Sequence, residues 1–318
     1  MNRTELSILI PTYNDCCAEL VNSLAQQAMS LSGLSYEIIV LDDASNRPEV
    51  LLQAAYINEL RNTRFVRRET NVGRAKIRNI LTSMARYRWL LFLDSDMEIV
   101  SPDFLERYLQ APPEATVVYG GNCVQRDRLP HEGTLKYRYE KAAEQTHDAA
   151  QRNKQPYQQF NTSNFLVARW VMEAHPFDER IQTYGYEDVL FGKTLRTAGI
   201  PILHIDNPVG FGTFESNRSF LAKTEEAMHT LFQYRKELVG YSNVLHTYAH
   251  LRRFRLAWLV RLLFLCVKKR MRTQLLSTHP SLFVFKCYKL GFYASLPHDQ
   301  QQGLCANFPH DCTTINKD

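Results

Sequence analysis

Two closely spaced carboxylates are the clearest chemical feature of this sequence. Asp94 and Asp96 stand on either side of a single serine, directly after the apolar run Trp89–Leu93, and no other Asp-x-Asp spacing occurs. Two carboxylates that leave one strand together can aim at a common point. Hard divalent ions such as Mg²⁺ take oxygen ligands and keep positions open for phosphate oxygens. The pair therefore indicates cation and phosphate chemistry, with a solvated turn as the alternative.

Polar residues also follow two other apolar runs. The run Leu6–Pro11 continues into Thr12 and Tyr13, and the run Tyr36–Leu41 continues into Asp42 and Asp43. Open parallel sheets bind ligands beyond the carboxyl ends of their strands. If all three runs are parallel strands, these polar residues share one edge of the sheet with the Asp94 pair.

A basic segment could bind the phosphates of such a ligand. Asn71 and Gly73 lead into what reads as a helix, and Arg78 lies one helical turn after Arg74. Glycine permits a close approach of the backbone, and an arginine can bind a diphosphate through two parallel hydrogen bonds. The alternative is an ordinary helix start with exposed basic residues.

Three further residues are candidates for proton transfer or metal binding. Glu187 and Asp188 stand at a predicted helix start, where the helix dipole favours ionised carboxylates. This would suit a general base, although these two residues alone would favour ordinary helix capping. His204 lies near the end of the last predicted strand. It could complete a metal site with Asp96, but a single histidine in a strand is more often a core residue.

The pattern of elements predicts an α/β fold. Strand-like and helix-like segments alternate through the first half, which implies right-handed crossovers and a parallel sheet. From about Phe220 only helix is expected. The predicted strands are Leu6–Pro11, Tyr36–Leu41, Arg64–Arg67, Trp89–Leu93, Ala115–Tyr119, Phe160–Ala168 and Pro201–Ile205. The predicted helices are Ala18–Ser30, Glu49–Asn62, Gly73–Tyr87, one with Ser101 as its N-cap, Leu135–Gln151 and Tyr186–Ala198.

Composition excludes several classes of protein. The 318 residues are 45% apolar and 22% charged, so the chain can bury a large core and is not disordered as a whole. The net charge is +5, but residues 252–272 hold eight basic residues and no acidic one, so the remainder carries −3. This distribution argues against a nucleic-acid-binding protein. The absence of a G-x-G-x-x-G motif argues against a dinucleotide oxidoreductase.

The cysteines and the start of the chain predict a cytoplasmic protein. Seven cysteines occur, without a C-x-x-C pair, and no signal peptide precedes the first predicted strand. An odd number of cysteines without paired spacing favours reduced thiols.

The basic tract contains a short apolar segment. Residues 254–267 include twelve apolar residues, interrupted only by Arg255 and Arg261. Fourteen helical residues span roughly 21 Å, less than the roughly 30 Å of a bilayer core. We therefore expect peripheral contact of residues 252–272 with the inner face of the cell membrane. The alternatives are a buried helix that packs on the catalytic domain and, third, a polyanion-binding tract.

Taken together, six motifs resemble the family 2 glycosyltransferases of the GT-A fold. They occur in the family's order over about residues 5–205: SILIPTYN, IIVLDDAS, NVGRAKIRN, FLDSDM, FNTSNFLVAR and YGYEDVLFGKTLRTAG. The resemblance implies a mostly parallel central sheet flanked by helices, with a helical C-terminal appendage. Residues 1–220 would form the catalytic domain, with a nucleotide-sugar half at about 1–100 and an acceptor half at about 101–220. Residues 221–318 would form the basic and apolar helical region.

The resemblance also assigns roles to single residues. Asp188 would be the catalytic base with Glu187 beside it, and residues 161–164 would line the sugar and acceptor pocket. Mn²⁺ or Mg²⁺ would be held by Asp94, Asp96 and His204. The nucleotide sugar would be bound by Pro11, Thr12, Tyr13, Asp42, Asp43, Asn71, Gly73, Arg78, Asp94 and Ser95.

The activity implied is inverting transfer of a hexosyl group from a nucleotide sugar, with UDP as the expected nucleotide. The acceptor would be a hydroxyl of a glycan or a lipid-linked sugar, in the assembly of cell-surface polysaccharide or glycolipid. A non-catalytic nucleotide-sugar-binding protein of the same fold is the alternative. The full set of acidic residues argues against it, because a site that has lost its activity should lack some of them. A sugar nucleotidyltransferase would need a Gly-rich basic loop after the first strand, and PTYND is not one.

Overall fold

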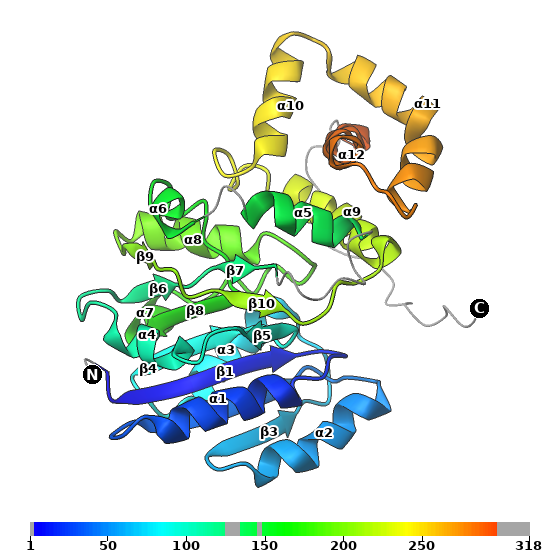
Figure 1. Cartoon of the computed structure of the whole chain (residues 1–318). Coiled ribbons are helices and arrows are strands. Elements are labelled where there is room, and N and C mark those ends of the chain that lie inside the picture. Colours follow the sequence, from blue (N-terminus) through cyan, green and yellow to red (C-terminus); the bar gives the residue numbers. More distant parts are fainter. Residues whose placement is uncertain (1–2, 125–133, 145–147, 298–318) are drawn as a thin grey trace.

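A seven-stranded sheet forms the centre of the molecule in a computed structural model that describes residues 3–124, 134–144 and 148–297 (Figure 1). The strand order is β3-β2-β1-β4-β8-β6-β9. Its strands are β1 (Glu5–Thr12), β2 (Ser35–Asp42), β3 (Thr63–Arg67), β4 (Trp89–Leu93), β6 (Val117–Tyr119), β8 (Asn164–Ala168) and β9 (Ile202–His204).

The sheet is mostly parallel, as the sequence predicts, but one strand runs the other way. β3, β2, β1 and β4 pair in parallel, and β9 is parallel to β6, whereas β8 is antiparallel to both of its neighbours, β4 and β6. All five residues of β8 are buried. A strand covered on both faces shows a continuous apolar run in either direction, so its sequence did not reveal its orientation.

A second, smaller sheet was not predicted. Its order is β5-β10-β7, with β5 (Met97–Ile99), β7 (Asn122–Cys123) and β10 (Val209–Phe211). Strands of two or three residues are too short to show a periodicity. This sheet matters for the site because β5 begins directly after Asp96. The main-chain N–H of Gly212 donates to the carbonyl of Asp96 over 2.9 Å, which fixes the backbone there.

Helices flank the central sheet on both sides (Figure 1). The predicted helix 135–151 is two helices, α5 and α6, and residues 145–147 lie outside the described ranges. The N-cap of α4 is Asp103 and not Ser101, whose hydroxyl instead donates to the Asp103 carboxylate. The helices are α1 (Ala18–Ser30), α2 (Pro48–Glu59), α3 (Arg74–Met84), α4 (Phe104–Gln110), α5 (Leu135–Glu144), α6 (Ala149–Arg152), α7 (Arg169–Ala174) and α8 (Glu187–Thr197).

The C-terminal part of the described chain is helical, as expected. It contains α9 (Asn217–Gln233), α10 (Asn243–Arg253), α11 (Ala257–Leu275) and α12 (Leu282–Ser295), which stand together at one end of the molecule in Figure 1. These helices share a hydrophobic cluster of their own, apart from the core around the sheet, and Leu135 and Leu190 of the preceding region join it. Among the described residues, no helix is long and apolar enough to cross a membrane.

A glycine sets how closely α11 approaches α12. A Cβ atom at Gly291 would lie 2.4 Å from a ring carbon of Phe264 and 2.9 Å from its Cβ. Phe264 is buried, and its ring also contacts Tyr288 with 5.4 Å between centroids. Because the contact involves the base of the Phe264 side chain, a rotation of the ring cannot relieve it.

We therefore expect Gly291→Val to lower the free energy of unfolding by about 1–3 kcal/mol, the usual cost of overpacking a core. Urea unfolding followed by circular dichroism would measure the loss. Lys286→Val, at an exposed position of the same helix, controls for the helix propensity of valine. Equal losses in the two variants would mean that the Phe264 contact is not tight.

Candidate active site

A cavity of about 850 Å³ lies at the carboxyl ends of β1 and β4. The first residues after each strand line it, and the loop after β2 contributes Asp43. The three strand ends therefore share one edge, as the sequence predicts. The lining includes twelve predicted site residues: Pro11, Thr12, Tyr13, Asp43, Asn71, Gly73, Arg78, Asp94, Ser95, Asp96, Glu187 and Asp188.

Asp43 binds the loop of residues 71–73, which precedes α3, and holds it at the end of β2. Its two carboxylate oxygens accept hydrogen bonds from the main-chain N–H groups of Val72 at 2.9 Å and Gly73 at 3.0 Å. Asn71 adds a bond from its amide to the Asp43 carbonyl at 3.1 Å. Gly73 has φ of +82°, a conformation that favours glycine. Burial raises the pKa of Asp43 above its usual value.

Asp42 has a structural role, which corrects its prediction as a donor-binding residue. It is completely buried and is not among the cavity-lining residues. Its carboxylate accepts bonds from the main-chain N–H and the hydroxyl of Ser45, and Arg67 lies 3.6 Å away. Alternation along the strand explains the difference, because consecutive residues point to opposite faces.

Four charged residues that line the cavity form a network. Arg78 donates to one oxygen of Asp94 at 2.5 Å, and Arg74 donates to the other at 3.2 Å. Arg74 also donates to Glu187 at 2.6 Å. The network joins the first two turns of α3, the end of β4 and the start of α8. Both oxygens of Asp94 therefore bind guanidinium groups, in contrast to the prediction that Asp94 binds a metal.

Asp188 differs from its neighbour Glu187. Both residues line the cavity, but Glu187 is buried and paired with Arg74, whereas Asp188 forms no ion pair with another described residue. One Asp188 oxygen accepts from the N–H of Val189 at 2.7 Å. Burial, with the charge of Glu187 as the next cause, raises the pKa of Asp188 to about 7. A carboxyl group with that pKa can take a proton near neutral pH.

Asp96 and Asp15 are the carboxylates that fit a divalent cation. The Asp96 side chain is 36% exposed, with Lys136 at 3.6 Å. Asp15 also lines the cavity, and one of its oxygens is buried without a hydrogen-bond partner among the described residues. Burial raises the pKa of Asp15, and the charge of Asp96 adds to the shift. Within the described ranges no group of three His, Cys, Asp or Glu side chains could hold a metal. One or two carboxylates with substrate phosphates are nonetheless a common Mg²⁺ ligand set.

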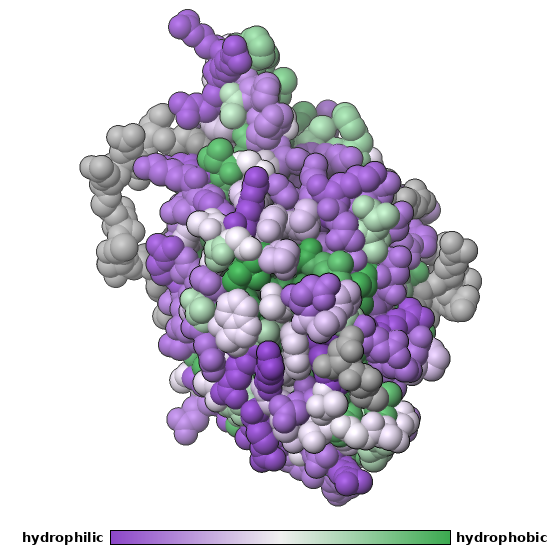
Figure 2. Space-filling view, turned by 90° about the vertical axis from the view of Figure 1, so that its left-hand side faces the viewer, coloured by the Kyte–Doolittle hydropathy of each residue, from purple (hydrophilic) through white to green (hydrophobic). Residues whose placement is uncertain are grey.

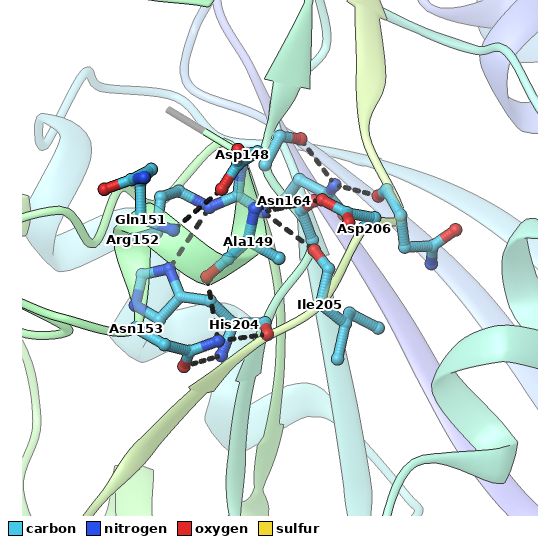
Figure 3. A network of polar contacts seen from close by, with 12 residues as sticks. Asp148, Ala149, Gln151, Arg152, Asn153, Asn164, His204, Ile205 and Asp206 are labelled. Carbon is cyan, nitrogen blue, oxygen red and sulfur yellow. Dashed lines mark hydrogen bonds and ion pairs between the residues drawn. The ribbon is translucent and has the colours of Figure 1, made fainter. Parts of the chain in front are cut away.

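His204 is a core residue and not a metal ligand, which corrects the prediction. It is 2% exposed and is not among the cavity-lining residues. Figure 3 shows its ring beside Arg152, whose Nε donates to Nδ1 at 3.3 Å. The other ring nitrogen, Nε2, donates a hydrogen bond to the carbonyl oxygen of Pro156 over 2.9 Å. Both nitrogens are thus engaged, and burial lowers the pKa of His204 to about 4.

The segment 161–164 divides between two roles. Asn161, Thr162 and Ser163 line the cavity, as predicted. Asn164 is completely buried, and its amide donates to the carbonyls of Gly121 and Asn207, each at 2.9 Å. It therefore joins β8 to the neighbouring loops and does not line the cavity.

Several cavity residues were not predicted. Two of them had a signal in the sequence: Arg74 directly follows Gly73, and Asp15 lies within four residues of the end of the first predicted strand. Many of the others come from three distant helices, where no local motif marks them. Those from α5, α9 and α12 are Lys136, Tyr139, Glu140, Ser219, Phe220, Lys223, Thr224, Ala227, Met228, Phe285 and Lys289.

Comparison with known sequences identifies the family. Residues 7–174, just over half of the chain, match Glycosyl transferase family 2. The chain belongs to this family.

The chain spans a third or less of the length of two curated relatives that it matches. An uncharacterized glycosyltransferase of Haemophilus influenzae is 36% identical over 107 residues, which are 33% of each chain. The poly(ribitol-phosphate) beta-N-acetylglucosaminyltransferase TarS of Staphylococcus aureus is 36% identical over 95 residues, 29% of this chain and 16% of TarS.

Solved structures confirm the GT-A fold. Residues 1–349 of Staphylococcus aureus TarS in complex with UDP align with a TM-score of 0.51 and 18% identity, over 92% of this chain and 89% of that one. A mannosyltransferase from Pyrobaculum calidifontis in complex with GDP-Man and Mn²⁺ aligns with a TM-score of 0.53 and 14% identity, over 91% and 84%.

The buried pair Arg78–Asp94 should dominate the stability of the site. The Arg78 side chain is 2% exposed. Removal of one partner from a buried ion pair typically costs about 3–5 kcal/mol, so we expect Arg78→Ala to lower the free energy of unfolding by about that amount.

Chemical unfolding would test this expectation against Arg64→Ala. Arg64 is 46% exposed and lies 3.7 Å from Glu37, so its removal should cost less than about 1 kcal/mol. Similar losses in both variants would contradict a buried, energetically important Arg78.

Proposed function

We propose that this glycosyltransferase catalyses inverting transfer of a hexosyl group from UDP-sugar to a hydroxyl group. The proposed acceptor is a glycan or a lipid-linked sugar in the assembly of cell-surface polysaccharide or glycolipid. One observation carries the mechanism: Asp188, with a pKa of about 7, lines the same cavity as the polar residues at the strand ends.

The proposed reaction is a single displacement. The acceptor oxygen forms a bond to the anomeric carbon while the bond from that carbon to the diphosphate oxygen breaks. The hydroxyl proton passes to Asp188, and the electron pair of the broken bond leaves with UDP. Attack from the face opposite the leaving group inverts the anomeric carbon.

Asp188 is better suited than Glu187 to accept this proton. The Glu187 carboxylate already accepts a charge-assisted hydrogen bond from Arg74 over 2.6 Å, so one of its oxygens is occupied. Asp188 forms no ion pair with a described residue, and its burial together with the charge of Glu187 raises its pKa despite the opposing charges of Arg74 and Arg78. Glu187 acts instead on the position of Arg74, whose other partner is Asp94.

Asp43, Asn71 and Gly73 are proposed to bind the nucleoside, and Asp96 with Asp15 to hold a divalent cation. Mn²⁺ or Mg²⁺ at that point would neutralise the charge of the diphosphate leaving group. The choice of UDP is supported by the sequence similarity to TarS, whose solved complexes hold UDP and UDP-GlcNAc.

The sharpest test of the mechanism is Asp188→Asn. We expect a 10²- to 10⁴-fold fall in the transfer rate, about the usual contribution of a general base. The affinity for UDP, measured by calorimetry, should change little. Glu173→Gln, an exposed acid on α7 that pairs with Arg169 at 2.9 Å, is the control and should keep full activity. Loss of UDP binding in Asp188→Asn would assign this residue a structural role.

The proposed role of Asp188 as the base also predicts how kcat/KM depends on pH. Only ionised Asp188 can accept a proton, so kcat/KM should rise as the pH increases through about 7. Initial rates from pH 5 to 9 would show this limb in the natural protein and its absence in Asp188→Asn. A flat profile in the natural protein would contradict the role of Asp188.

The proposed cation site predicts that loss of the Asp96 carboxylate weakens both Mn²⁺ binding and sugar transfer. Asp96→Ala should weaken Mn²⁺ binding and lower transfer at least about tenfold, because a carboxylate ligand is lost. Calorimetric titration of Mn²⁺ in the presence of UDP measures the binding directly, and EDTA should abolish transfer by the natural protein. Glu98→Ala, two residues away, is the control. Transfer that is unaffected by EDTA would exclude the cation.

A further inference from the structure

Helix α11 and the turn before it carry a concentrated apolar surface. Eight of the seventeen large hydrophobic side chains exposed in the described ranges lie between residues 254 and 267, and each is 36–68% exposed. They are Phe254, Leu256, Trp258, Leu259, Leu262, Leu263, Leu265 and Val267. Scattered exposed apolar residues are normal, but a contiguous patch marks an interaction site.

Only one side of α11 packs against the rest of the described chain. Phe264 and Leu275 are buried, and Phe264 packs against Gly291 and Tyr288 of α12. The side chains of Trp258 and Leu262 are 65% and 52% exposed. The helix therefore has two apolar sides, of which α12 covers one. Figure 1 shows α11 at the outer edge of the helical region, and Figure 2 shows apolar side chains among hydrophilic ones at that end of the molecule.

Positive charge surrounds the exposed apolar side. Within residues 252–272, Arg272 pairs with Glu225 at 2.6 Å, and Lys268 lies over the rings of Phe264 and Phe292. The other six basic side chains are exposed and form no ion pair with any described residue. They are Arg252, Arg253, Arg255, Arg261, Lys269 and Arg270.

We propose that residues 252–270 bind the surface of a bilayer that contains anionic phospholipids, with α11 lying in the plane of the membrane. The 19 residues of α11 extend roughly 28 Å. Its exposed apolar side chains would enter the boundary between headgroups and acyl chains. The long arginine and lysine side chains would reach the lipid phosphates.

A second copy of the chain fits this surface less well. In a two-fold symmetric dimer the same patch contacts itself. Six unpaired cations would then meet six more, and residues 252–272 contain no acidic residue that could pair with them. An anionic lipid surface provides both the apolar interior and the negative charge.

The position of α12 connects this surface to the cavity. α12 packs against α11 through Gly291 and also lines the cavity through Phe285 and Lys289. If the proposed function is correct, membrane binding would hold the cavity wall that α12 forms beside the lipid surface, where a lipid-linked acceptor would lie. Membrane binding itself does not depend on that function, and vesicles without any sugar substrate can test it.

Vesicle sedimentation is the direct experiment. The full chain should bind vesicles of phosphatidylcholine with phosphatidylglycerol, bind vesicles of phosphatidylcholine alone at least about tenfold more weakly, and dissociate as salt screens the charges. Leu262→Gln with Leu263→Gln should lower the affinity for the anionic vesicles at least about tenfold, as should Arg252→Gln with Arg253→Gln.

Trp170→Gln is the matched control for loss of an exposed apolar side chain. Trp170 is 48% exposed on α7, so this variant should bind vesicles like the natural chain. Circular dichroism would show that each variant is folded. Failure of the natural chain to bind anionic vesicles would overturn the proposal. A dimer in light scattering that Leu262→Gln with Leu263→Gln abolishes would also overturn it, since the surface would then belong to a second copy.

Discussion

The charge network of Arg74 and Arg78 is the interaction on which the site depends. Two guanidinium groups from successive turns of α3 bind both oxygens of Asp94, and one of them also binds Glu187. The three elements involved are distant in sequence, and these hydrogen bonds fix where β4 ends relative to α8. Buried charges require such pairing because an unpaired ion in the interior is very costly. The network therefore positions Asp188 as well, one residue beyond Glu187.

The same network gives two adjacent carboxylates different chemistry. Glu187 is paired and buried, while Asp188 lies at the cavity without a cation, and burial raises its pKa to about 7. Neighbouring titratable groups in different environments are a recurrent way to separate acid–base roles. The network also occupies Asp94, so in this structure Asp96, with Asp15 nearby, offers oxygens to a cation.

The sequence predicted those parts of the fold and site that depend on local patterns. Apolar runs located β1, β2 and β4, and the polar residues after them meet at one cavity because parallel strands end at one edge. The direction of β8 and the three strands of the small sheet gave no local signal. Asp42 and His204 were misassigned because the sequence alone does not show which face a strand residue occupies, and both face the interior.

The two sides of the cavity are therefore formed by different kinds of element. The side formed by strand ends consists of short motifs, and its residues are set within a few positions of the β1, β2 and β4 ends. The opposite side comes from α5, α9 and α12, whose placement depends on a separate hydrophobic cluster. Phe285 and Lys289 line the cavity from α12, which packs closely on α11 at Gly291. Changes in the C-terminal helices can therefore alter the helical side of the cavity without disturbing the Arg78–Asp94 pair or the contacts of Asp43. A fold built in this way can keep the side formed by the strand ends while the helical side, and the surface beside it, diverge.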